Sequence, residues 1–348
     1  MKPQNNHRIL VQILHQIAGE KKIKMTTFSQ DWIIRLEKDG LVKYIYGYDF
    51  DLNSASVQLI AKDKSAVSDL LEFNHLPHVE HQLFLHPRQA AYVSSAGNWS
   101  EILKFAQKHH FNLVCKPNQG TGGHGIFHTQ DCLSLEKAVH ELFTANRAIS
   151  LSPFYDIKNE YRVYVLKNDC QLTYCKTLPN IIGDGRLSIA DLIMAKSKQE
   201  LTPEVVKQAV QTYADCLDQI PKSGDSLSLV WKHNLGQGAL PEIITNPTLL
   251  TRLKKLALAC AQALNLSFAA IDIIKTDNKY LVLEVNSGIM MESFAMLSPQ
   301  NHAIAKSIYT NAIDLMFDNS HILTKNTPTK PSCKNFGCLQ DFFAIIML

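Results

Sequence analysis

Two apolar segments late in the chain constrain its fold most. FAAIDIIK at 268–275 and YLVLEVN at 280–286 are separated by the turn-like TDN, which predicts a pair of adjacent strands. Glu284 and Asn286 are two residues apart, so their side chains leave the same face of the second strand. In a hairpin of this length Asp272 lies across from Glu284. An acid inside an apolar strand is costly to bury without a partner.

Carboxylate and amide oxygens are the hard ligands that Mg²⁺ prefers alongside phosphate. The hairpin therefore predicts a metal site of Asp272, Glu284 and Asn286. The alternative is that Asp272 and Glu284 only lie on a solvated face of the sheet.

A glycine-rich segment, KPNQGTGGHGIF, follows the short apolar run FNLVC. Glycines allow backbone amides to approach phosphate oxygens closely. The pattern lacks the Gly-Lys-Ser/Thr ending of a P-loop, and a strand-like IFHTQ stands where a dinucleotide fingerprint has a helix. We therefore predict a strand-loop-strand flap over a triphosphate, with Lys116 beneath it, against the alternative of a hairpin without function. The glycines are Gly120, Gly122, Gly123 and Gly125.

The remaining patterns indicate a mixed α+β chain. Residues 61–74 and 100–109 have helical spacing, and YRVYVLKNDCQLTYCK predicts a hairpin with Asn168 and Asp169 as its turn. Thr202 and Pro203 are typical of a helix start, and the pattern carries that helix through VVKQAVQTYADCLDQI. The first sixty residues predict a small lobe without a recognisable site.

Composition narrows the classes of partner. The 35 Lys and Arg against 32 Asp and Glu leave a net charge of +3, and aromatics do not interleave with the basic residues, so nucleic acid is not an expected partner. No segment has the roughly 18 apolar residues of a membrane span, and no secretory signal is expected at the amino end. Eight scattered cysteines favour a reducing, cytoplasmic location over a disulfide or zinc framework.

The order and spacing of these motifs resemble the ATP-grasp superfamily. K-P-x-x-G-x-G-G-x-G-I-F comes first, then E-Y-R-V-Y-V-L, then Asp272 and E-V-N twelve residues later. NEYRVYVLKNDCQLTYCKTLPNIIGDGRLSIADLI and KHNLGQGA are similar to the ligase domain of cyanophycin synthetase and of bifunctional glutathione synthetases. The resemblance covers about residues 61–315 and extends to the ribosomal-protein glutamate ligases.

The resemblance implies roles for individual residues. Lys64 and Lys116 contact nucleotide phosphates, and Glu160 matches an acidic position near the ribose. Val114 and Ile274 are expected as adenine walls, with plain core packing as their alternative. A linker strand should present its backbone to adenine, although relatives usually place Glu at its first position; its residues are Pro153, Phe154 and Tyr155.

Positive charge is expected where negative charge develops during the reaction. The candidates are Arg162, Lys176 and Lys232, and the resemblance implies that Lys232 and the neutral Asn234 lie near phosphate and metal. The segment from Ser287 to Glu292 replaces the small-Pro-Gly turn of many relatives, and we expect it to line the acceptor site.

The implied function is peptide-bond-forming ligation with ATP and Mg²⁺, with two ions expected and Mn²⁺ as the alternative metal. The expected substrates are a small-molecule or peptide carboxylate and an amine. An ATP-binding regulatory module without turnover, or a phosphotransferase that stops at a phosphorylated product, remain as alternatives. We expect two α+β lobes that grip ATP. The boundaries are an N-terminal α/β lobe at 1–60, an ATP-grasp domain at 61–318 with a flap lobe at about 98–154 and a central lobe at about 155–318, and a tail at 319–348.

Overall fold

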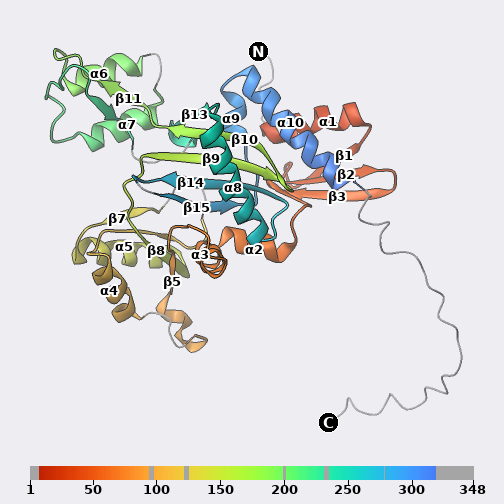
Figure 1. Ribbon diagram of the computed structural model, residues 1–348, viewed down its shortest axis with the longest axis horizontal. Helices are drawn as coiled ribbons and strands as arrows, with labels where there is room; N and C mark the ends of the chain where they lie inside the picture. The colour runs from red at the N-terminus through yellow and green to blue at the C-terminus, as the bar shows by residue number, and fades with distance from the viewer. Residues whose placement is uncertain are drawn as a thin grey trace, which may run out of the picture.

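The computed structural model describes residues 8–93, 98–120, 125–198, 201–230, 235–277 and 279–318. Its described elements form four sheets and the helices around them (Figure 1). In that part of the chain, no helix combines the length and apolar character needed to cross a bilayer. The mixed helices and antiparallel sheets confirm the predicted α+β class.

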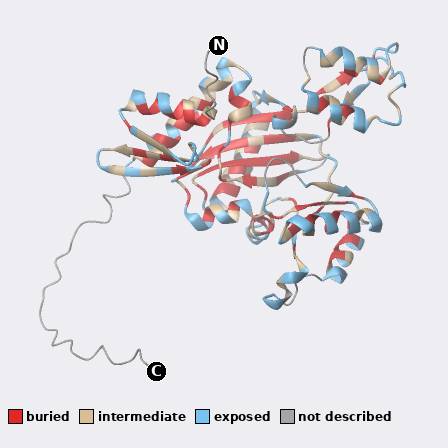
Figure 2. Ribbon diagram, turned by 180° about the vertical axis from the view of Figure 1, so that it is seen from behind, coloured by how far each residue is buried: buried red, intermediate tan, exposed pale blue. Residues whose placement is uncertain are grey.

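A five-stranded antiparallel sheet forms the centre, in the order β13-β10-β9-β14-β15. Figure 2 shows buried residues running along these strands, and in Figure 1 helix α8 lies across the sheet. Helices α2, α3 and α8 cover one face and share a core with its odd-numbered side chains on β9 and β14. The elements are α2 (Ala55–Lys62), α3 (Lys64–Phe73), β9 (Asn159–Leu166), β10 (Asp169–Thr177), β13 (Leu240–Ile243), α8 (Pro247–Ala263), β14 (Phe268–Lys275) and β15 (Tyr280–Asn286).

The other face of the central sheet packs against elements from both ends of the described chain. Helices α1 and α10 lie side by side there (Figure 1) and share one core with the four-stranded sheet β1-β2-β3-β4. The elements are α1 (Ile9–Lys21), β1 (Lys24–Phe28), β2 (Ile33–Lys38), β3 (Leu41–Tyr46), β4 (Asp49–Phe50), η2 (Leu235–Gln237), α9 (Glu292–Met296) and α10 (Pro299–Met316). The predicted boundary at residue 60 stays a prediction.

The glycine-rich segment belongs to a separate lobe with its own core. Its sheet has the order β5-β8-β6-β7, with α4 and α5 packed on it. Asp131 caps α5 through a reciprocal hydrogen-bonded box with Ser134. The elements are β5 (Gln82–Leu85), η1 (Pro87–Ala91), α4 (Trp99–Lys108), β6 (Leu113–Pro117), β7 (Phe127–Thr129), α5 (Cys132–Ala145) and β8 (Ala148–Pro153). The predicted second strand after the glycines is confirmed as β7.

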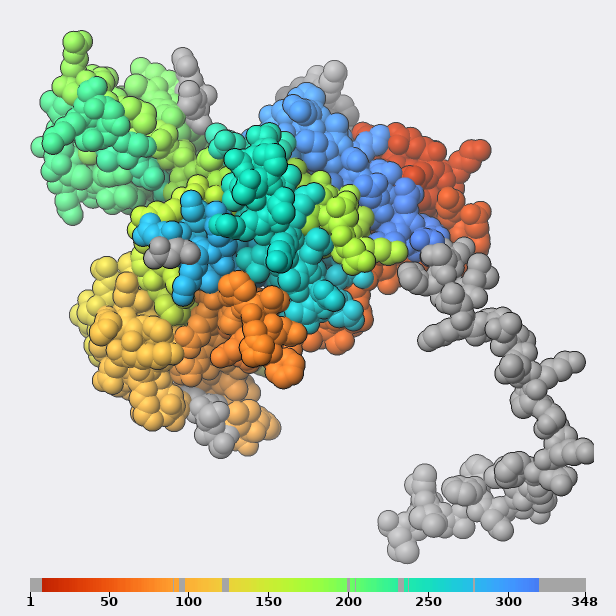
Figure 3. Space-filling view, in the orientation of Figure 1, coloured from red at the N-terminus to blue at the C-terminus, as the bar shows by residue number. Residues whose placement is uncertain are grey.

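A fourth core, which the sequence did not predict, stands apart from the central sheet. The space-filling view in Figure 3 shows it as a distinct bulge on one side of the molecule. Its elements are β11 (Asn180–Ile182), α6 (Ile189–Ser197), α7 (Pro203–Thr212) and β12 (Ser226–Ser228).

Three local predictions were right in the type of element and wrong in its bounds. Residues 61–74 contain the end of α2 and the whole of α3, because Asp63 has extended backbone and accepts the amide of Ala66 as the N-cap of α3. The hairpin turn precedes its expected place: Asp169 already pairs with Leu166, and Lys167 adopts φ 52°. Helix α7 begins after Thr202 as predicted but ends at Thr212, and the Tyr213 hydroxyl bonds the carbonyl of Ser228.

Candidate functional site

A cavity of about 1000 Å³ lies where the central sheet meets the flap lobe and the N-terminal sheet. One part of its wall, here called the charged end, is built by Lys64, Lys116, Glu160, Arg162, Lys176, Asp272 and Glu284. Another part, here called the aromatic end, is built by Trp32, Tyr46, Tyr48, Met290 and Phe294. The two ends come from elements far apart in the sequence.

The charged end arises because the side chains on one face of β9 and β14 change from apolar to charged along the strands. Tyr164 and Ala270 pack in the core shared with α1 and α10 and also border the cavity, and Arg162 and Asp272, two residues away on the same face, line the cavity without belonging to that core. Arg162 and Asp272 are also register partners across the two strands. The alternation of a single strand pair therefore supplies both the core and the site.

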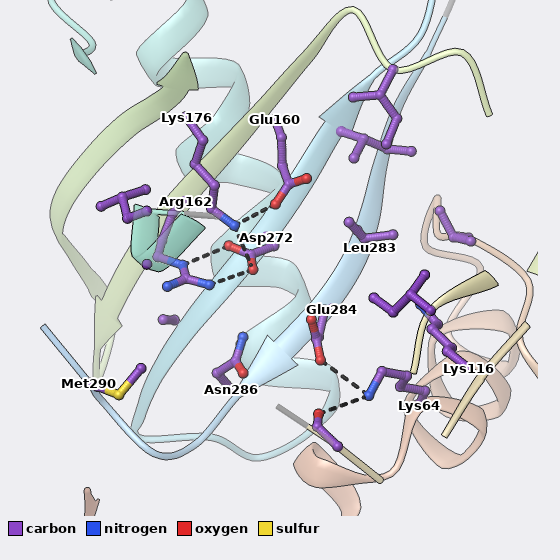
Figure 4. A pocket seen from close by; sticks show the side chains of 18 of the residues that line it. Lys64, Lys116, Glu160, Arg162, Lys176, Asp272, Leu283, Glu284, Asn286 and Met290 are labelled. Carbon is purple, nitrogen blue, oxygen red and sulfur yellow. Dashed lines mark hydrogen bonds and ion pairs between the residues drawn. The ribbon is translucent and has the colours of Figure 1, made fainter. Parts of the chain in front are cut away.

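Four charged side chains form a network on this face (Figure 4). The Arg162 guanidinium donates to both Asp272 oxygens, at 2.8 and 2.7 Å, and the Lys176 ammonium lies 3.0 Å from Asp272. Lys176 also donates to Glu160. Burial alone would raise the pKa of Asp272, but Arg162 and Lys176 outweigh it and lower the pKa to about 2. Burial raises the pKa of Glu160 despite its contact with Lys176.

A β-bulge on β15 brings the other two predicted metal ligands to the cavity. Asp272 pairs with Glu284 in register, as predicted, and the register shifts between Asp272 and Ile273. The shift places Leu283 and Glu284, which are consecutive, on the same cavity wall together with Asn286. The side-chain nitrogen of Asn286 is buried and has no hydrogen-bond partner among the described residues.

The two lysines predicted to contact phosphate, Lys64 and Lys116, reach the cavity from two different elements, α3 and β6. Lys64 is the first residue of α3, and its ammonium lies 3.3 Å from Glu284 and 3.2 Å from the Gly120 carbonyl. Lys116 is buried on β6, and no ion pair joins it to another described residue. Burial lowers its pKa to about 8, an effect that Lys64 reinforces and Glu284 opposes. An uncompensated buried ammonium is a cation available to an anionic ligand.

The predicted adenine and ribose residues also line this cavity, namely Val114, Pro153, Phe154, Tyr155 and Ile274 for adenine and Glu160 for the ribose. Gly120 lines it too, whereas Gly125 does not; with φ 64° Gly125 packs near the Pro117 ring instead. Four predicted site residues lie outside the described residues, namely Gly122, Gly123, Lys232 and Asn234.

The aromatic end was missed by sequence reasoning. Trp32, Tyr46 and Tyr48 come from the N-terminal lobe, which had no recognisable motif. The available signal was the aromatic-glycine run YIYGY at 44–48, close after Asp31 and Trp32. The segment after Asn286 lines the cavity through Gly288 and Met290.

Comparisons with known proteins identify similar sequences and folds. A family model described as a RimK-like ATP-grasp domain matches residues 189–309. The glutathione biosynthesis bifunctional protein of Streptococcus agalactiae serotype V is 25% identical over 262 residues, covering 70% of this chain and 33% of the relative. The protein of the same name from Mannheimia succiniciproducens is 24% identical over 184 residues, covering 48% of this chain and 24% of the relative.

Among solved structures, a bifunctional glutathione synthetase from Pasteurella multocida superposes with a TM-score of 0.52 at 18% identity, covering 88% of this chain and 44% of that chain. These findings confirm the ATP-grasp fold and the resemblance to ATP-grasp proteins. The chain spans about one third of the length of the first curated relatives it matches, at 33%.

Proposed function

Because residues 189–309 match an ATP-grasp domain of the RimK-like type, we propose that this chain is an ATP-dependent carboxylate–amine ligase. Its curated relatives are named for glutathione biosynthesis, which is the formation of a peptide bond. The proposed substrates are an amino-acid or peptide carboxylate and an amine.

One observation carries the proposal. Two lysines from α3 and β6, two carboxylates and an amide from β14 and β15, and the linker strand β8 all border a single cavity. These are the side chains that phosphate, divalent metal and adenine need. A fold alone does not fix a function, but this convergence of complementary charges is specific to a site.

The proposed reaction has two steps. A substrate carboxylate oxygen attacks the γ-phosphorus of ATP, the bond to the bridging oxygen breaks, and ADP leaves with that electron pair. The amine then attacks the acyl phosphate, phosphate departs and the amine loses a proton. No protein nucleophile is required, so the chain supplies alignment, charge and exclusion of water.

Each charged residue has a defined task in this scheme. Lys64 and Lys116 hold the phosphates. Lys64 would exchange its contact with Glu284 for phosphate, whereas Lys116 has no ion pair with another described residue to lose. Arg162 and Lys176 stand where negative charge grows on the acyl phosphate and the tetrahedral intermediate. Val114 and Ile274 flank the adenine, which the backbone of β8 orients.

The residues present also fit Mg²⁺. Asp272, Glu284 and Asn286 offer two carboxylates and one amide to the cavity. Arg162 and Lys176 contact the Asp272 oxygens and Lys64 lies 3.3 Å from Glu284, so a bound Mg²⁺ would share or replace these cations. The described residues hold no cluster of three or more His, Cys, Asp or Glu side chains, which suits an ion that keeps water and phosphate oxygens as ligands. When bound, Mg²⁺ neutralises phosphate charge and aligns the γ-phosphoryl group.

The test is release of ADP and phosphate from Mg²⁺-ATP with carboxylates and amines offered singly and in pairs, with product masses recorded. The proposal expects ADP release that depends on the amine and a product mass equal to the sum of the pair less water. ADP release without an amine identifies a phosphotransferase instead. Tight ATP binding without turnover for any pair identifies a regulatory module.

A further inference from the structure

The aromatic end of the cavity is held in place by an unusual stretch of backbone. Ser29, Gln30 and Asp31, between β1 and β2, all have left-handed φ angles, of 52°, 54° and 65°. The Arg8 guanidinium donates to the carbonyls of Asp31 and Gly47. It therefore fixes the turn that delivers Trp32 to the cavity wall.

The Trp32 ring is seated directly on a glycine. Gly47 has φ 60°, and a Cβ built on it would lie 2.9 Å from the Trp32 ring carbon Cζ2. Tyr46 and Tyr48 meet the same ring edge-to-face, each with centroids 6.3 Å away. The Arg8 guanidinium lies 4.8 Å from the Trp32 centroid. The orientation of this indole is thus defined on several sides.

This wall adjoins the predicted metal ligand Asn286. Asp49 forms an antiparallel bridge with Gly288, and the Ile289 amide donates to the Tyr48 carbonyl at 2.9 Å. The aromatic end therefore begins where Asn286 ends β15. Figure 4 shows Met290 on the other side of Asn286 from Lys64.

The charges around the aromatic end are satisfied from within the protein. Lys62 pairs with Asp49, and the Glu292 carboxylate accepts the amides of Ile9 and Leu10 as well as the Tyr48 hydroxyl. In contrast, Trp32, Tyr46 and Met290 keep 43%, 61% and 51% of their surface exposed. Arg8 lies outside the cavity lining and donates to two backbone carbonyls. A charged substrate group placed here would therefore lose water and gain no free counter-charge from the described side chains that line this end, whereas an apolar group would cover exposed rings.

We propose that Trp32, Tyr46 and Met290 form a specificity pocket for a bulky apolar side chain, best an aromatic one, on the amino-acid or peptide substrate. The inference rests on the proposed ligase function, since it names the class of substrate for the same cavity. Trp32 and Tyr46 offer exposed ring surface to such a side chain, and the flexible Met290 can adapt to its shape.

The test compares free amino acids and Ala-X dipeptides in which X is Phe, Leu, Glu, Lys or Gly, offered in pairs with Mg²⁺-ATP. We expect the Phe probes to have the highest kcat/KM. Trp32→Ala should lower the Phe-to-Glu ratio of kcat/KM on the order of 10- to 100-fold, because an aromatic contact is lost. The KM for ATP should stay unchanged.

Two further variants cover the case in which Trp32→Ala folds poorly. Tyr46→Ser removes an exposed ring and should lower the same ratio, whereas Met290→Lys should shift preference toward the Glu probes. Phe28→Ala is the matched control, because Phe28 is exposed on the same sheet but does not line the cavity. Phe28→Ala should leave the Phe-to-Glu ratio at the wild-type value. If the other variants acted by loosening the whole lobe, Phe28→Ala would change the ratio as well.

The outcomes separate the pocket from the ligase. Amine-dependent ADP release that is fastest with Glu, Lys or Gly probes overturns the pocket and leaves the ligase intact. If no pair turns over, the result contradicts the ligase proposal. The pocket proposal is then tested by calorimetry of L-phenylalanine binding in the presence of Mg²⁺ and a non-hydrolysable ATP analogue. Binding that Trp32→Ala abolishes supports it, and absence of binding overturns it.

Discussion

At the charged end of the cavity, every cation and carboxylate projects from a strand or helix of a packed lobe, whereas Trp32 at the aromatic end is positioned by a turn and packs on a glycine. The first end handles phosphate charge, which requires specific residue types at fixed spacing. The second end requires only shape and apolar surface, which many residues can provide. The proposed reaction thus depends on side chains of regular elements, and the proposed choice of substrate depends on the turn that positions Trp32.

The largest effect should come from removing one carboxylate at the charged end. Glu284→Gln keeps the shape of β15 but halves the negative charge that Asp272 and Glu284 offer to a metal. We expect ATP turnover to fall by at least on the order of 10³-fold. Steady-state ADP release with the best substrate pair measures it.

Glu242→Gln is the matched control for this change, because Glu242 is an exposed carboxylate on β13 of the same sheet. It should retain wild-type turnover. Near-normal ADP release by Glu284→Gln would show that the metal assignment is wrong.

The next effect concerns stability. Arg162→Met leaves the buried Asp272 carboxylate with Lys176 as its remaining ion-pair partner among the described residues. Breaking one side of a buried pair is expected to cost about 3 kcal/mol in the free energy of unfolding. Urea denaturation at pH 7 measures this loss.

The same pair predicts a dependence on pH. The pKa of Asp272 is lowered from 3.8 to about 2, so its stabilising contribution is complete above pH 4 and is lost as the pH falls through 2; a shift of this size is worth about 2 kcal/mol. The penalty of Arg162→Met should therefore be smaller at pH 3 than at pH 7. Lys104→Met, which breaks an exposed pair with Glu101, should cost less than about 1 kcal/mol at either pH. Equal losses for the two variants would contradict the buried network.

The contrast between the two ends also explains what the sequence could predict. The sequence predicted that Asp272, Glu284 and Asn286 lie together because alternation along apolar strands indicates which face a polar residue occupies, and all three line the cavity. The pairing of Arg162 with Asp272 was not found, because strand order in a sheet depends on contacts 110 residues apart. Trp32 was missed for a related reason, since its role depends on Arg8 and Gly47. The early end of α7 likewise reflects a tertiary contact, between Tyr213 and Ser228.

A change at Gly47 sharpens the comparison from the aromatic end. Gly47→Ala adds a Cβ that would lie 2.9 Å from the Trp32 ring at φ 60°, so the ring must shift. We expect a loss of about 1–2 kcal/mol in stability and a higher KM for the amino-acid or peptide substrate, with the KM for ATP unchanged. Thermal unfolding and the two KM values measure this.

Gly40→Ala separates backbone strain from the ring contact. Gly40 has φ 79°, but a Cβ there would meet nothing within 4 Å. Its stability should fall by about 1 kcal/mol while both KM values stay at wild type. If Gly47→Ala raises the KM for ATP as much as that for the substrate, the two ends are not separable.

The smallest expected effect is the uptake of a fraction of a proton when nucleotide binds at the charged end. Lys116 has a pKa of about 8, so it is about half protonated at pH 8. Phosphate contact stabilises the ammonium form and raises this pKa, so nucleotide binding at pH 8 should take up about 0.5 proton, and affinity should weaken as the pH rises further. Calorimetry of ADP binding in two buffers with different ionisation enthalpies measures the uptake. Lys116→Met should abolish it and Lys137→Met, an exposed lysine on α5, should not. Uptake that persists in Lys116→Met would assign the titration to another group and remove Lys116 from the phosphate site.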